Sequence, residues 1–187
     1  MKNNIIHLVI LFLSTTALFA QKTKKMTMEK FEIPEAGIVF EAASGWGFFS
    51  KTGKLEQGKV QYSYGHSHVQ GNGRLVNPSI IITVDKGSWF TDEKNYLEEK
   101  LDFHKMMGDV IKKTYSPGDK NNPLALKNAY YSEGISEEAD HPYGQQYILI
   151  TFWNQKAGVH IAIQTSGKDL KANKEAYQAL IKSIQKM

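Results

Sequence analysis

Two histidines separated by a single residue are the side chains best suited to metal chemistry in this sequence. His66 and His68 fall in a segment with strand-like alternation, in which side chains at i and i+2 point the same way, about 7 Å apart at Cα. Both imidazoles can then reach one metal ion. The ion needs a third ligand, and the candidates are distant in the sequence: Glu133, His141 and His160. The competing interpretation is a polar strand end that enters a glycine-rich loop.

Aromatic side chains with polar tips form a second candidate site. Tyr62 and Tyr64 lie on the same strand face as the two histidines, and Trp46 and Trp89 are expected near strand ends or in loops. Rings of this kind suit a ligand groove or a protein interface. We therefore predict these four residues as ligand-binding. The alternative is that this strand face packs beneath a helix.

No other pattern in the sequence indicates catalysis. The acidic segment at residues 137–141 lacks the spacing of a calcium loop and is typical of a solvated turn. The glycines around Asn72 fit a tight hairpin turn, not a phosphate-binding loop. The chain has no cysteine, which excludes disulfides and thiolate sites, and no Gly-x-Ser-x-Gly motif. We expect no cofactor and, on balance, no enzymatic activity.

Hydrophobic periodicity predicts the elements that must position these side chains. Alternating or continuous apolar patterns indicate strands over residues 31–33, 37–42, 60–70, 74–85, 126–135, 145–153 and 159–165. Residues 50–59 are polar and are expected to form a loop. Apolar arcs of helical period predict a long helix over residues 92–113 and a terminal helix that Ser166 and Asp169 begin as a capping-box variant.

This order of elements predicts an α+β fold. Adjacent strands are joined by short turns, which indicates a mainly antiparallel sheet. The segment at residues 145–153 is apolar on both faces, so both faces of the sheet should be covered. We expect an α/β/α sandwich with a helix on each face.

The N-terminus carries the features of a secretory signal peptide. Lys2 is followed by an apolar run and a small residue, Ala20, suited to cleavage. We expect residues 1–20 to be a signal peptide, residues 21–30 a flexible basic tail, and residues 31–187 a single domain. The run is short for a membrane span, so no stable membrane anchor is expected.

The charge distribution argues against nucleic acid as a partner. Five of the 23 basic residues, but only one of the 19 acidic residues, fall within the first 30 positions. The remainder is formally neutral, and Arg74 is the only arginine available for bidentate phosphate or base contacts.

Three segments resemble the PsbP-like fold family, which includes secreted bacterial proteins of unknown role. They are residues 37–42 followed by Gly45 and Trp46, the strand pair at residues 145–165, and the closing segment at residues 177–184. The resemblance implies a PsbP-like α/β/α domain in a small accessory or binding protein.

These observations lead to one functional expectation and one alternative. We expect a secreted or periplasmic, non-catalytic binding or accessory protein of the cell envelope, whose partner is a small molecule or an envelope protein. The alternative is a metal-binding protein or metal-dependent enzyme that uses His66 and His68. A purely structural envelope protein is the third possibility.

Overall fold

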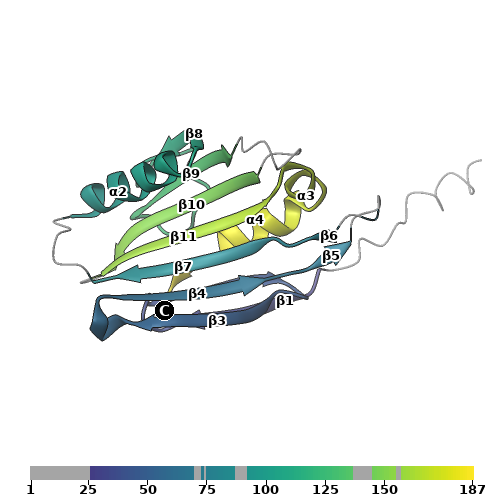
Figure 1. The fold of residues 1–187 in the computed structure, drawn as a ribbon, viewed down its shortest axis with the longest axis horizontal. Helices are drawn as coiled ribbons and strands as arrows, with labels where there is room; N and C mark the ends of the chain where they lie inside the picture. The colour runs from purple at the N-terminus through teal and green to yellow at the C-terminus, as the bar shows by residue number, and fades with distance from the viewer. Residues whose placement is uncertain (1–25, 70–72, 74, 87–91, 137–144, 155–156) are drawn as a thin grey trace, which may run out of the picture.

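An antiparallel sheet of seven strands, in the order β3-β4-β7-β11-β10-β9-β8, dominates the fold (Figure 1). The computed structural model describes residues 26–187, apart from residues 70–72, 74, 87–91, 137–144 and 155–156. The strands of the sheet are β3 (Gly47–Lys54), β4 (Lys59–Gly65), β7 (Ser79–Asp85), β8 (Asp109–Tyr115), β9 (Ala129–Ser136), β10 (Gln145–Asn154) and β11 (Ala157–Ser166).

The centre of this sheet is buried on both faces, with isoleucines toward the main core and Tyr147, Leu149 and Ala162 toward the opposite face. Ile148 of β10 pairs with Ile163 of β11, which pairs in turn with Ile80 of β7. β-branched side chains pack well on a pleated surface that is covered on both sides. The predicted central strand at residues 145–153 is therefore confirmed.

A smaller sheet covers one face of the large sheet near β4. It consists of β1 (Met28–Ile33), β2 (Ile38–Ala43) and β12 (Gln185–Lys186), in the order β1-β2-β12. Phe31 and Phe40 pack against Tyr64 of β4 with ring centroids 5.2 and 5.3 Å apart. A third sheet is the hairpin of β5 (His68–Val69) and β6 (Leu75–Val76), which extends the β4–β7 pair.

Helices lie on opposite faces of the large sheet (Figure 1). The helix α2 (Glu93–Met106) covers a small apolar cluster centred on Tyr147 and Leu149. On the other face, α3 (Gly167–Ala172) and α4 (Lys174–Ser183) lie over the main core together with β1 and β2. This arrangement confirms the predicted mainly antiparallel sheet with a helix on each face. Within the described part of the chain, no helix is long and apolar enough to cross a membrane.

The helix predicted over residues 92–113 ends earlier than expected. It stops at Met106, and Gly108 follows with a φ of +85°, a left-handed conformation that terminates helices. Val110 and Ile111 then belong to β8, where their β-branched side chains are favoured. The apolar residues at helical spacing therefore extend by chance beyond the end of α2 into β8.

Two further predictions were wrong in detail. The segment expected to be a polar loop, residues 50–59, contributes to the edge strand β3 and the short 3-10 helix η1 (Leu55–Gln57). Nearly all residues of β3 are exposed, and charged side chains on an edge strand also discourage pairing with another chain. The terminal helix is divided at Asn173 into α3 and α4.

Candidate functional site

The helix α4 separates two hollows on the same face of the large sheet. Its buried residues Tyr177, Leu180 and Ile181 fix it on the core. The side of α4 toward β2 and β4 borders a cavity that contains the two predicted histidines. The side toward β9 borders a longer groove. Tyr177 lines both.

The first hollow, which we call the histidine cavity, has a volume of about 200 Å³. Its lining comes from the end of β2 and the turn after it, from the residue after β4, from β5, and from α4 and its cap: Ala43, Trp46, His66, His68, Asn173, Ala176, Tyr177 and Leu180. Trp46 and His66 are stacked with centroids 6.0 Å apart, and His66 stacks on His68 at 5.0 Å. The structure thus places Trp46, His66 and His68 together, as one short array of rings.

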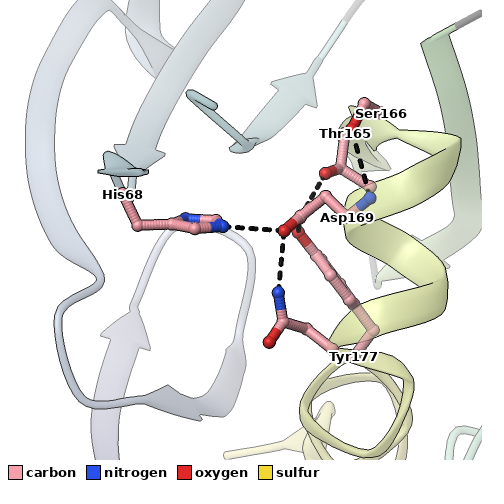
Figure 2. Close-up of polar contacts among 6 residues, drawn as sticks. His68, Thr165, Ser166, Asp169 and Tyr177 are labelled. Carbon is pink, nitrogen blue, oxygen red and sulfur yellow. Dashed lines mark hydrogen bonds and ion pairs between the residues drawn. The ribbon is translucent and has the colours of Figure 1, made fainter. Parts of the chain in front are cut away.

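A buried carboxylate fixes the orientation of His68. Nε2 of His68 lies 2.8 Å from Oδ1 of Asp169, which is fully buried in the first turn of α3 (Figure 2). The same carboxylate accepts hydrogen bonds from the hydroxyls of Thr165 and Tyr177 and from the Asn173 amide at 2.5, 2.5 and 2.7 Å. The Ser166 hydroxyl accepts from the backbone N–H of Asp169, which confirms Ser166 as the helix cap.

These donors keep Asp169 charged despite its burial. Burial alone would raise the pKa of its carboxyl group, but hydrogen bonds from Thr165, Tyr177 and Asn173, together with the charge of His68, outweigh it and lower the pKa. Burial and the neighbouring carboxylate raise the pKa of Tyr177, which therefore remains a donor. A charged Asp169 holds the proton of His68 on Nε2.

The two tyrosines predicted to bind a ligand lie elsewhere. Tyr62 and Tyr64 are 7% and 5% exposed and line none of the hollows described here. Tyr64 packs among Phe31, Phe40 and Phe48, under β1 and β2 rather than under a helix. Trp89, the fourth predicted residue, lies outside the described residues.

The candidates for a third metal ligand do not join the two histidines. Glu133 faces the groove on the other side of α4, and His160 lies beneath α2. His141 and the rest of the acidic segment at residues 137–141 lie outside the described residues. In the described ranges, no group of three or more histidine, aspartate or glutamate side chains is arranged to hold a metal ion.

A second pair of histidines is buried under α2. Nε2 of His104 lies 3.4 Å from Nε2 of His160, while the outer nitrogens contact Asp109 at 2.7 Å and Thr151 at 2.9 Å. Both rings are thus hydrogen-bonded on both sides. Burial first, then the charge of His104, lowers the pKa of His160 to about 3, so this imidazole is neutral. The network ties α2 to the sheet.

The second hollow, which we call the α4 groove, is larger than the histidine cavity. A cavity of about 440 Å³ between α3, α4 and strands β9 and β10 adjoins another of about 200 Å³ beside β8. The two share four lining residues: Tyr131, Glu133, Gln178 and Ile181. Ile148, Leu170 and Ile181 give the larger cavity apolar walls. This volume falls within the range of small-molecule sites.

Charges at the α4 groove are divided between its two rims. Lys171 and Lys174 are exposed on the helical rim, and Lys182 continues this basic rim beside the smaller cavity. On the strand rim, the hydroxyl of Tyr131 donates to Glu133 at 3.0 Å. Burial and the charge of Glu133 raise the pKa of Tyr131, which therefore stays protonated. The groove combines apolar walls with a cationic edge.

The sequence indicated neither the α4 groove nor the buried contact of Asp169 with His68. We interpreted Asp169 as part of a capping box, whereas its side chain is buried against His68, a residue 101 positions earlier. A signal was present, since Asp169, Asn173 and Tyr177 are spaced at i, i+4 and i+8 and so fall on one helical face. No comparable signal joins the residues of the groove, which come from α3, α4, β8, β9 and β10 and from the loop after β8.

Comparisons with known proteins establish the fold and nothing finer. No protein-family model matches the sequence, and no curated protein matches it. Among solved structures, the Ran-binding protein Mog1p of Saccharomyces cerevisiae is similar with a TM-score of 0.55 and 11% identity, over 86% of this chain and 96% of that one. Cyanobacterial PsbP from Synechocystis sp. PCC 6803 is similar with a TM-score of 0.50 and 11% identity, over 90% of this chain and 97% of that one. The chain therefore has the α+β fold of these two proteins, as the resemblance to the PsbP-like fold implied.

Proposed function

We propose that the chain is a secreted, non-catalytic binding or accessory protein of the cell envelope that holds its ligand in the α4 groove. The observation that carries this proposal is the groove itself, with apolar walls and a lysine rim. Such a lining suits a ligand with an apolar body and an anionic group, because the body displaces water from Ile148, Leu170 and Ile181 while Lys171 and Lys174 meet the charge.

Two other observations support the proposal. The leader-like residues 1–20 support export, with cleavage near Ala20. A protein of the same fold, Mog1p, is described as Ran-binding, so this fold serves recognition of a protein partner in at least one case. A partner in the envelope is therefore compatible with both the fold and the leader.

Site-specific photo-crosslinking in cells that make the full chain tests the groove. A photoreactive amino acid replaces Gln178, which is exposed in the groove, or Lys94, which is 75% exposed on α2. We expect an adduct at position 178 and none at position 94. The mass of the adduct separates a protein partner from a small molecule. Equal labelling at both positions, or labelling only on α2, would contradict the proposal.

A charge-reversal variant tests whether the basic rim contributes to binding. Lys174→Glu places a negative charge on the basic rim and should weaken the adduct at position 178 at least several-fold, whereas Lys94→Glu should leave it unchanged. Export is tested separately, by sequencing the N-terminus of the protein found outside the cytoplasm. We expect it to begin near Gln21.

A further inference from the structure

Two neighbouring nitrogen atoms lack the partners that buried polar atoms normally have. Among the buried side-chain nitrogen and oxygen atoms of the described residues, only Nδ1 of His66 and Nδ1 of His68 make no hydrogen bond. Native proteins satisfy the great majority of such atoms, and exceptions often mark the place of an ion or a water molecule. Both exceptions belong to adjacent, stacked rings, so a single bound ion would satisfy both nitrogens.

The surroundings of His68 prepare its Nδ1 as a ligand. Nε2 of His68 lies 2.8 Å from Oδ1 of Asp169, and the tautomer that donates from Nε2 to this oxygen presents a lone pair at Nδ1. Metal-binding histidines commonly donate their second nitrogen to a carboxylate, which fixes the tautomer and the ring orientation. Thr165, Tyr177 and Asn173 hold that carboxylate in turn.

The separation of the rings fits a shared ion. Two imidazoles that bind one ion at about 2.0–2.1 Å, with an angle between 90° and 110°, have ring centroids about 5 Å apart. The centroids of His66 and His68 are 5.0 Å apart.

Gly45 leaves space beside His66. A Cβ at this position would lie 2.6 Å from Cε1 and 2.8 Å from Nδ1 of His66. Any side chain there would therefore crowd the edge of the ring that carries the unpartnered nitrogen. The histidine cavity, which both rings line, adds room for the water molecules that would complete the coordination of an ion.

We propose that His66 and His68 bind a divalent first-row transition-metal ion through their Nδ1 atoms, with Asp169 as the positioning residue of His68. Two imidazoles and water form a nitrogen and oxygen ligand set, for which copper(II) has the highest affinity among these ions. Only two protein ligands hold the ion, so it exchanges with solution. The site lies on the opposite side of α4 from the groove, so this proposal is independent of the proposed function.

Copper(II) titration of the metal-free protein, beginning at Gln21, tests the site. We expect one ion per chain, a rise in melting temperature with added copper, and an electron paramagnetic resonance spectrum with two imidazole nitrogens. His68→Gln is the informative variant, because its amide N–H can still donate to Asp169 while the Nδ1 lone pair is gone. It and His66→Gln should each weaken binding at least tenfold and remove one nitrogen from the spectrum. His141→Ala should change neither.

A pair of glycine variants separates occlusion of the site from backbone strain. Gly45 and Gly58 have similar positive φ angles, +103° and +99°, but a Cβ at position 58 meets nothing within 4 Å. Both Gly45→Ala and Gly58→Ala should lose stability through backbone strain, Gly45→Ala the more because its Cβ also meets His66, and only Gly45→Ala should abolish copper binding. The proposal is overturned if the double variant His66→Gln/His68→Gln binds copper as tightly as the wild type. Loss of binding in His141→Ala would overturn it as well.

Discussion

Replacing Asp169 by asparagine should be among the most destabilising single polar changes in this protein. Four side-chain donors converge on the carboxylate, from Thr165, Tyr177, Asn173 and His68. An asparagine offers one acceptor oxygen and turns two N–H donors toward the remaining donors. Leaving a buried donor without its charged acceptor costs about 1–3 kcal/mol per group, and several donors are affected, so we expect Asp169→Asn to lower the free energy of unfolding by about 3–5 kcal/mol.

Urea unfolding of the chain that begins at Gln21 measures this effect at pH 7. Asp102→Asn is the matched control, since Asp102 makes an exposed ion pair with Lys105 and its side chain is 66% exposed. Exposed pairs contribute little, so the control should change stability by at most about 0.5 kcal/mol. A loss below about 1 kcal/mol in Asp169→Asn would refute the account of the buried network.

The pH dependence gives the same prediction an independent check. The pKa of Asp169 is lowered on folding from its ordinary value of 3.8, so its stabilisation is fully present at neutral pH. It is lost as the pH falls below about 4, through the folded pKa, because the unfolded chain takes up the proton first. The stability difference between wild type and Asp169→Asn should therefore narrow between pH 4.5 and pH 3. A constant difference over this range would contradict the sign of the pKa shift.

Two further predictions concern the face covered by α2. Gly158→Ala should lower the free energy of unfolding by about 1–3 kcal/mol, because its Cβ would lie 2.5 Å from the buried ring of Tyr96. The control is Gly47→Ala, whose Cβ would meet nothing within 4 Å and which should leave the melting temperature nearly unchanged. Folding lowers the pKa of His160 from 6.5 to about 3, so below pH 6.5 the unfolded chain takes up a proton that the folded protein does not. The free energy of unfolding should therefore fall by up to about 1.4 kcal/mol per pH unit as the pH drops below 6.5. Urea unfolding between pH 7 and pH 4.5 should show a shallower decline in His160→Gln; an unchanged slope would exclude this residue as the cause.

The fold was predictable wherever the hydrophobic pattern reports local burial. Residues 145–153 are apolar on both faces, and they form the central strand β10. The pattern failed at residues 107–113, where an arc of helical period crossed from α2 into β8, because periodicity does not register the left-handed φ of Gly108. It failed again at residues 50–59, because an exposed edge strand has no apolar face to reveal it.

The candidate sites were less predictable, because they depend on contacts between distant segments. The spacing of His66 and His68 correctly indicated neighbouring rings, although β4 ends at Gly65, before the first of them. Nothing local connects His68 with Asp169, or His104 with His160, which are 56 positions apart. The α4 groove arises only when α3 and α4 cross the strands β9 and β10.

Amide hydrogen exchange on the protein with its crosslinked partner would test the binding role of the α4 groove most directly. The account predicts slower exchange in α4 (Lys174–Ser183) and β9 (Ala129–Ser136), with α2 (Glu93–Met106) unchanged. Protection confined to α2, or to β3 at the opposite edge of the sheet, would contradict it.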